Sequence, residues 1–264
     1  MQISSVALDQ LGPWLNANQG VLSLGLFIAT VFAGWASGIF AALRRRPKFN
    51  IDLIEGPTFA CTFGAPSGQG FDLVHRTGIA LYLHIANVGS APSSIKALKV
   101  GYHWALMPFS KDWLRYRLGW FWLEHESVCL EDFQAELGEH IKFYPFLTQL
   151  SSISGHSADS YLQVGRSANG VAYFEQSDSW GGCFPVSVNQ KVQIKIGVQD
   201  VFGKWHYRAL VIPKVSLAEA RRYNPSFGLT LSSLRDGDVP FELEVDGHGN
   251  VLPSQKSSSP PAGQ

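Results

Sequence analysis

An uninterrupted apolar run, residues 21–43, constrains this chain most, because it contains no charged side chain. A helix of that length rises about 34 Å, enough for a bilayer hydrocarbon core of about 30 Å. A helix also pairs the backbone polar groups internally, as lipid requires. A buried core helix and a cleaved signal peptide are the alternatives. We predict a stable transmembrane helix, because no Lys or Arg precedes the run and it exceeds a typical signal core.

Basic residues follow the apolar run at once, namely Arg44, Arg45, Arg46 and Lys48, whereas the N-terminal flank carries only Asp9 as a charged residue. Lys and Arg beside a membrane span tend to remain in the cytoplasm. We therefore predict a single-pass protein of the cell membrane, with its N-terminus outside and its C-terminal domain in the cytoplasm.

Small residues recur every fourth position within the apolar run, at Gly34, Gly38 and Ala42. This spacing lets two membrane helices approach closely, although small residues are also common in membrane helices that do not associate. The pattern predicts self-association or pairing with a helix of a partner protein.

The composition after the basic segment favours short strands. Charged residues make up only 16% of the chain and aromatic residues 12%, and 26 Gly and 14 Pro supply turns. The 21 basic and 21 acidic residues balance, which argues against a nucleic-acid partner. Three cysteines form a sparse set that fits a reducing compartment better than a disulfide framework.

Alternating apolar residues predict strands over 49–56, 58–63, 79–87 and 95–106. The strand–turn–strand unit over 79–106 resembles the hairpins of immunoglobulin-like sandwiches. This resemblance implies a mainly β fold, an immunoglobulin-like β-sandwich with short helical insertions. The whole chain is then divided as follows: N-terminus 1–20, transmembrane helix 21–43, basic juxtamembrane segment 44–48, β-sandwich domain 49–236, short hairpin or extension 237–252 and disordered tail 253–264.

Further elements follow from turn and cap residues. A short helix is predicted over 127–137, and a hairpin is predicted around residues 166–169. A second hairpin joins 191–199 to 204–212 across a turn opened by Asp200 and closed by Gly203. Ser216 begins a capping box for a helix that ends before Pro225.

An aromatic cluster between residues 109 and 124 is a candidate interface. Its members are Trp113, Arg115, Tyr116, Arg117, Trp120 and Trp122. Alternation over 114–122 predicts a strand with outward arginines, and a helix from Ser110 is the alternative. Trp and Arg are frequent interface hot spots, so the cluster indicates contact with a membrane or a partner; a core strand with solvated arginines is the alternative reading.

Catalytic motifs are absent from the sequence: it has no phosphate-binding GxxxxGK[ST], GxSxG, HExxH or CxxC. Two histidine sets are weaker candidates for metal ligands. His84, His103 and His206 lie on predicted strands and could converge on a zinc-type site, or they could be unrelated polar-face residues. A second set would need the predicted helix over 127–137: His125, Cys129, Asp132, Glu136 and His140.

Together these features predict a membrane-anchored cytoplasmic binding or adaptor module, or an accessory subunit of a membrane complex, rather than an enzyme. Its expected partners are the lipid bilayer and a protein, with no nucleic acid and no cofactor. The alternatives are a metal-dependent enzyme built on the three strand histidines and a membrane-tethered sensor of a small ligand.

Overall fold

The computed structural model describes residues 13–14, 16–38, 45–65, 74–104, 106–148, 160–176, 184–229, 234–235 and 239–243. The chain forms two compact units, Met1–Arg46 and Pro47–Gln264. The tail predicted over 253–264 lies outside the described residues, as does most of the extension 237–252, of which 239–243 are described.

The first unit contains helix α2, Gln19–Ala36, which is long and apolar enough to cross a membrane and has no buried residue. A signal sequence would satisfy the same criteria of length and composition. Its 18 residues span about 27 Å. The helix is therefore shorter than the predicted run 21–43.

The small-residue pairing face is not continuous on this helix. Gly34 lies within α2, but Gly38 lies beyond its end with φ +76°, and Ala42 falls outside the described residues. A residue in the left-handed region cannot continue an α-helix, so Gly34 and Gly38 do not share one helical face. Association of this segment with another membrane helix stays a prediction.

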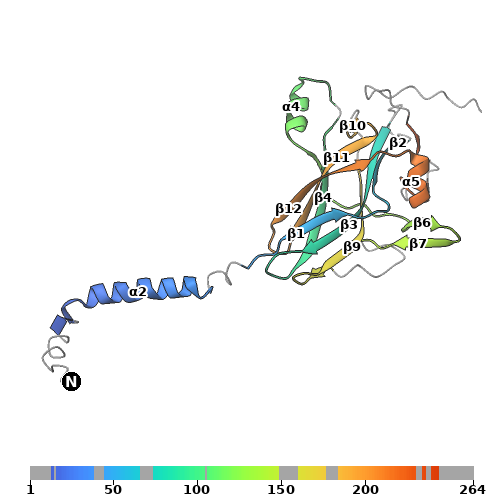
Figure 1. Cartoon of the computed structure of the whole chain (residues 1–264). Helices are drawn as coiled ribbons and strands as arrows, with labels where there is room; N and C mark the ends of the chain where they lie inside the picture. Colours follow the sequence, from blue (N-terminus) through green and yellow to red (C-terminus); the bar gives the residue numbers. More distant parts are fainter. Residues whose placement is uncertain are drawn as a thin grey trace, which may run out of the picture. The chain divides into compact units, whose positions relative to one another are not determined.

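The second unit is mainly β, with two large sheets and a small one (Figure 1). The five-stranded sheet contains β1 (Phe49–Leu53), β2 (Phe59–Ala65), β3 (Val74–Asn87), β9 (Ser167–Glu175) and β13 (Phe241–Glu242). The six-stranded sheet contains β4 (Ser93–Tyr102), β5 (Phe121–Leu123), β8 (Tyr161–Leu162), β10 (Ser187–Val188), β11 (Lys191–Asp200) and β12 (Trp205–Pro213). The small sheet pairs β6 (Phe133–Leu137) with β7 (His140–Tyr144), and the helices are α4 (Lys111–Leu118) and α5 (Leu217–Tyr223). All described pairings between named strands are antiparallel.

One hydrophobic core fills the space between the two large sheets. Alternate residues of β3 point into it, and all of them are fully buried: Ile79, Leu81, Leu83 and Ile85. The facing sheet contributes Leu98, Val100 and Tyr102 of β4 and Val192, Ile194, Ile196 and Val198 of β11. The period of two in these strands was sufficient to predict this core, and the prediction is confirmed.

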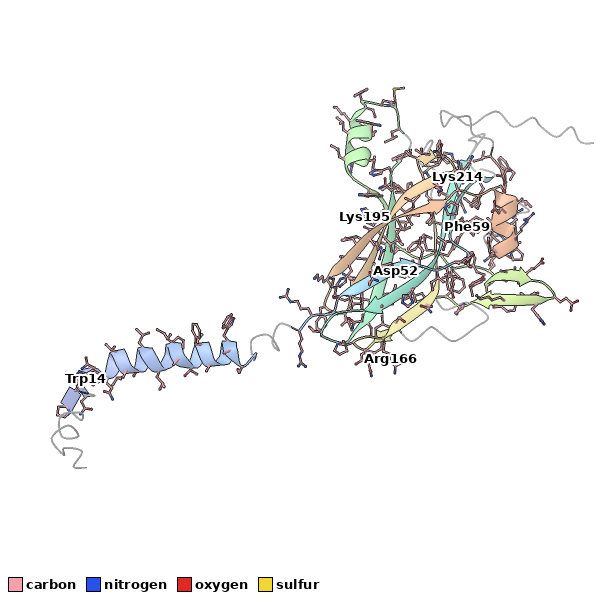
Figure 2. The ribbon with its side chains drawn as sticks, in the orientation of Figure 1. Trp14, Asp52, Phe59, Arg166, Lys195 and Lys214 are labelled. Carbon is pink, nitrogen blue, oxygen red and sulfur yellow. The ribbon has the colours of Figure 1, made fainter. Side chains whose placement is uncertain are left out.

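A second core covers the other face of the five-stranded sheet. Phe59, labelled in Figure 2, packs there against Phe133 and Phe227, with ring centroids 6.4 and 5.5 Å apart. Helix α5 and the β6–β7 pair supply the covering layer. Ser216 caps α5 as predicted, because its Oγ accepts the Glu219 backbone N–H at 3.1 Å.

The predicted helix over 127–137 is wrong. Residues 133–137 form strand β6, and Gly138, with φ +64°, lies in the turn to β7 instead of ending a helix. Phe133 is fully buried in the second core, so tertiary packing outweighs the local helical pattern. Residues four apart therefore do not share a helical face here.

The segments 79–87 and 95–106 do not form the predicted hairpin, because β3 and β4 belong to different sheets. Between them the chain turns around the fully buried Asn87 side chain. Its Nδ2 donates to the carbonyl oxygens of Ala91 and Leu162, at 2.8 and 3.1 Å. Its Oδ1 accepts the N–H groups of Gly89 and Lys48, at 3.0 and 3.4 Å. One amide thus joins three segments at this corner: the entry to β1, the turn that follows β3 and the end of β8.

The hairpin predicted around residues 166–169 is also wrong. Strand β8 pairs with β4, whereas β9 pairs with β3, so the connection between them again passes from one sheet to the other. Gly165, with φ +78°, lies in this connection, whereas Gly170 lies within β9 opposite Leu83, so the two glycines do not mark the ends of a hairpin.

The β11–β12 hairpin is confirmed, with Gly203 at φ +85°. Asp200 Oδ1 accepts the N–H groups of Phe202 and Lys204, and Oδ2 lies 2.9 Å from His206 Nε2. Burial raises the pKa of Asp200, but these hydrogen bonds outweigh it and lower that pKa below its ordinary value. The ionised carboxyl therefore stabilises the fold above its ordinary pKa, and this contribution is lost as the pH falls through the lowered value.

We predict that Asn87→Ala lowers the free energy of unfolding by about 2–4 kcal/mol, because it leaves one buried carbonyl group and three partly buried backbone groups without their Asn87 partners. Urea unfolding of the full chain in detergent, followed by tryptophan fluorescence, measures the change. Asn169→Ala is the control, since Asn169 is exposed and bonds only His84 among the described residues. Equal losses in the two variants would contradict the role of Asn87.

Candidate functional site: an aromatic–lysine sheet face

The outer face of the six-stranded sheet carries an ordered pattern of side chains. Residues of β11 that alternate with its buried positions face outward, and those from Lys195 to Gln199 have neighbours on both β4 and β12. Lys195 lies between Gly101 and Ala209. One row further along, Gly197 lies between Lys99 and Tyr207. Large rings and lysines therefore alternate with residues that have almost no side chain.

Two glycines make room for the rings. A Cβ at Gly197 would lie 2.8 Å from a Tyr207 ring carbon and 3.2 Å from a Trp205 ring carbon. A Cβ at Gly101 would lie 3.0 Å from the Trp122 ring. The rings therefore lie against the backbone of the sheet, an arrangement that covers exposed glycines in strands.

Lysine ammonium groups occupy the faces of these rings. Lys99 Nζ lies 4.6 Å from the Trp122 ring centroid and 4.1 Å from the Trp205 centroid. Lys195 Nζ lies 5.1 Å from Tyr207 and 5.8 Å from Trp120. These distances are those of cation–π pairs. We call this set the aromatic–lysine face, and it consists of Lys99, Trp120, Trp122, Lys195, Trp205 and Tyr207 (Figure 2 labels Lys195).

The face is positive within a chain whose formal charge is zero. The outward positions of β4, β11 and β12 in these rows include lysines and no acidic residue: Ala97, Lys99, Gly101, Lys191, Gln193, Lys195, Gly197, Gln199, Trp205, Tyr207, Ala209 and Val211. Within the described part of the chain, neither Lys99 nor Lys195 forms an ion pair. An anionic group approaching the face would therefore meet unneutralised ammonium groups.

The sequence-predicted interface is divided between this face and α4. Trp120 and Trp122 belong to the face, whereas Trp113, Arg115, Tyr116 and Arg117 lie on α4. The Arg117 side chain falls outside the described part of the structure. The predicted strand over 114–122 is wrong for residues 114–118, where the alternative helix from Ser110 is correct, and a strand, β5, begins only at Phe121.

Local interactions explain the helix. Ser110 Oγ accepts the Trp113 N–H at 2.9 Å, which is an N-cap bond. Tyr116 holds the helix against the sheet, since its ring centroid lies 5.0 Å from that of Trp104. Other apolar side chains around α4 remain in solvent, including Met107, Phe109 and Leu118, which are 79%, 85% and 83% exposed.

A cavity of about 440 Å³ opens next to the aromatic–lysine face. Its lining is His103, Val186, Val188, Lys191, Gln193 and Val211. His103 connects it with the face, because its ring centroid lies 4.2 Å from that of Trp120. The face and the cavity are therefore one continuous candidate site.

The three strand histidines point to different parts of the fold. His84 faces away from the main core and hydrogen-bonds Asn169, whereas His206 is buried against Phe49 and bonds Asp200. His103 lies on the outward side of the other sheet. The prediction that His206 shares an outward face was wrong, because β12 presents its even-numbered residues to the core.

Among the residues that the structure describes, no group of three His, Cys, Asp or Glu side chains could hold a metal ion. This finding covers the strand histidines. It also covers the second set, His125, Cys129, Asp132, Glu136 and His140. The helix predicted to bring these residues together does not form, because residues 133–137 are strand β6. Neither set therefore forms the metal site that the enzyme alternative requires.

Two buried carboxyls are engaged within the fold. Burial raises the pKa of Glu126 and of Glu175, in spite of hydrogen bonds that favour ionisation. Thr148 donates to Glu126, and the Tyr173 hydroxyl donates to Glu175 at 2.7 Å. Arg76 forms an ion pair with Glu175 at 3.3 Å. These contacts assign both carboxyls a structural role.

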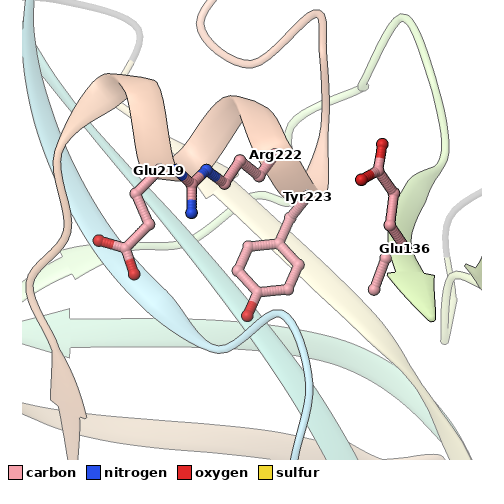
Figure 3. A pocket seen from close by; sticks show the side chains of 5 residues that line it. Glu136, Glu219, Arg222 and Tyr223 are labelled. Carbon is pink, nitrogen blue, oxygen red and sulfur yellow. The ribbon is translucent and has the colours of Figure 1, made fainter. Parts of the chain in front are cut away.

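A second cavity, of about 550 Å³, lies between α5 and β6 (Figure 3). Its lining includes Glu136, Glu219, Arg222 and Tyr223, and Figure 3 shows Glu136 across from the side chains of α5. The three charged residues are exposed, so water solvates them at little energetic cost. Its charged groups are of both signs, Glu136 and Glu219 against Arg222, so the cavity offers no site of a single charge to an ionic ligand.

Sequence reasoning missed Lys99, Lys195, Trp205 and Tyr207. The available signal was the confirmed β11–β12 hairpin: its register places Lys195, Trp205 and Tyr207 on the solvent side, where large rings are unusual. Their proximity to Trp122 depends on the β4–β11 pairing, which joins segments far apart in the chain.

Comparison with known proteins gives no relative: no family model matches the chain, and neither curated proteins nor solved structures yield a match. The immunoglobulin-like resemblance therefore has no support beyond the coarser finding of a mainly β domain with packed sheets.

We predict that Gly197→Ala displaces the rings of Tyr207 and Trp205, because its Cβ would approach both within 3.2 Å. The ¹⁹F NMR spectrum of the 5-fluorotryptophan-labelled chain should show the Trp205 resonance shifted, with Trp205→Phe as the assignment. Gly138→Ala is the control, since its Cβ meets nothing within 4 Å and adds only backbone strain. An unchanged Trp205 resonance in Gly197→Ala would refute the close packing.

Proposed function

We propose that this protein is a membrane-anchored binding module that captures an acidic, extended segment of a partner protein on the aromatic–lysine face. The observation that carries the proposal is the outward sheet face with lysines held over aromatic rings and no acidic residue in its rows. Its ammonium groups are fixed in position and only partly exposed, so carboxylates bind there without ordering flexible lysines first.

The chemistry of the face favours a polypeptide over a nucleic acid. Single-stranded nucleic acids stack their bases on open aromatic faces. Here the ring faces of Trp122 and Trp205 are already occupied by Lys99. Lipid insertion would require rings that protrude, whereas these rings lie against Gly101 and Gly197. The ammonium groups of Lys99 and Lys195 can instead pair with carboxylates of an extended acidic chain.

The anchor makes a modest interface sufficient. In this proposal α2 spans the bilayer, and the basic residues Arg44, Arg45, Arg46 and Lys48 keep the β domain in the cytoplasm. Confinement to a membrane raises the local concentration of a module toward partners in the same membrane. The protein then acts as an adaptor or accessory subunit of a membrane complex.

The fold places the cavity end of the site away from the point where the chain enters the domain. Phe49 pairs with Asn87 at the corner that precedes β4. Strand β4 then runs about 33 Å to the end where α4 lies. Trp120 and the cavity lie toward that far end, where α4 is also found (Figure 1). A partner can thus engage the site without contacting the corner.

We predict that a reporter fused after Gln264 is active only if it functions in the cytoplasm, because the basic flank retains the C-terminal side there. An N-terminal epitope tag should stay on the membrane-bound chain, which excludes a cleaved signal. Replacing Arg44, Arg45, Arg46 and Lys48 by Gln should weaken this orientation. Reporter activity outside the cytoplasm, or loss of the tag, would overturn the proposed topology.

We predict that the full chain in detergent binds the N-acetylated, C-terminally amidated peptide Asp-Glu-Asp-Glu-Asp-Val, as measured by tryptophan fluorescence. The double variant Lys99→Gln, Lys195→Gln should bind it about tenfold or more weakly, since two charge-assisted contacts are lost. Affinity should also fall with added salt.

Lys142→Gln is the matched control, because Lys142 makes the same kind of contact with Tyr144, at 4.8 Å, on strand β7. It should leave peptide binding unchanged. Equal loss in the control, or tighter binding of an oligothymidine or of anionic lipid vesicles than of the peptide, would contradict the proposed partner class.

A further inference from the structure

The cavity beside the aromatic–lysine face combines one apolar wall with separate polar groups. Val186, Val188 and Val211 form the apolar part, and His103, Lys191 and Gln193 supply the polar atoms. A small branched side chain fits an apolar wall of this kind, and a ligand that fills the cavity must also satisfy the polar groups.

The hydrogen-bonding capacity of His103 is fixed by its other nitrogen. Nδ1 lies 2.9 Å from the Tyr116 carbonyl oxygen, which can only accept, so Nδ1 carries the proton. In the neutral ring Nε2 is then an acceptor. The same bond satisfies a carbonyl in the last turn of α4, so the ring is held in place by both the helix and Trp120.

Lys191 and Gln193 are donors on the same strand. They occupy alternate positions of β11, so both project from its outward side. Lys191 has no ion pair among the described residues. An ammonium and an amide N–H group side by side are suited to the two oxygens of a carboxylate.

The rim of the cavity is held in an uncommon backbone conformation. Asn189 and Gln190, between the lining residues Val188 and Lys191, have φ of +52° and +57°. Asn tolerates this region, but Gln rarely adopts it. The Gln190 carbonyl oxygen accepts the Lys214 N–H at 2.8 Å, which secures the turn. Asn189 and Gln190 are the two central residues of the hairpin turn that joins β10 to β11, and two-residue hairpins of this type require positive φ at both positions.

We propose that this cavity binds the C-terminal residue of the partner's acidic segment, a proposal that rests on the function proposed above. The terminal carboxylate accepts from Lys191 and Gln193, and the last peptide N–H donates to His103 Nε2. A small branched apolar side chain contacts the valines. The domain therefore recognises the free C-terminus of the partner in the cavity, and the acidic residues that precede it bind along the aromatic–lysine face.

The test compares the amidated peptide with the same acetylated peptide carrying a free C-terminal carboxylate, both titrated against the full chain in detergent. The free acid should bind about tenfold or more tightly, because a charge-assisted contact is added. Lys191→Gln should remove this preference. Val188→Trp should do the same by filling the cavity, and Val188 is 67% exposed, so the fold accommodates the larger ring.

Lys204→Gln is the matched control, since Lys204 is exposed in the β11–β12 turn, at the opposite end of β11. It should retain the full preference for the free acid. A third probe, 3-methylbutanoate, carries the same branched apolar group and carboxylate without a peptide. If it binds as tightly as the free-acid peptide, the cavity is a small-molecule site, and the C-terminal proposal is overturned.

The outcomes separate the two proposals. If both peptides bind equally and depend on Lys99 and Lys195, the aromatic–lysine face stands as the partner site and the C-terminal inference fails. If neither peptide binds, the proposed function fails as well. A preference for the free acid that Lys191→Gln abolishes supports both.

Discussion

The buried amide of Asn87 is the interaction on which the arrangement of the sheets depends. It supplies two donors to carbonyl groups and accepts two N–H groups, so the chain can leave one sheet and begin the other without unpaired backbone groups. A tight hairpin at this point would place β3 and β4 in one sheet. With the amide in place, β4 instead becomes the neighbour of β11, and Lys99 comes to lie beside the rings of β12.

Local patterns predicted the strands better than their partners. The burial of Ile79 and Leu81, the β11–β12 hairpin and the Ser216 cap follow from period and turn chemistry alone. The β3–β4 and β8–β9 connections could not be predicted, because a turn sequence is the same whether the chain folds back or crosses over. Residues 133–137 became a strand because of Phe133, whose partners are distant in sequence.

The candidate site shows the same division between local and distant information. Trp120 and Trp122 could be selected from the sequence as an interface, but the lysines beside them come from other strands. Overall neutrality concealed a local positive surface, because formal charge sums over the chain while a partner meets one sheet face. His206 was assigned to the outward face for a related reason. Which side chains of β12 point to the core depends on its register with β11, and this register places His206 inside.

The antiparallel pairing of β1 with β3 also determines how the domain would respond to mechanical force. Strand β1 is the first element after Pro47, and its residues from Phe49 to Leu53 pair with β3 in one continuous register. In the proposed arrangement, with the N-terminus in the membrane and a partner on the opposite sheet, tension along β1 would shear these pairs together instead of separating them one at a time. If the proposed topology holds, the first strand would carry the pulling load and the aromatic–lysine face would keep its shape.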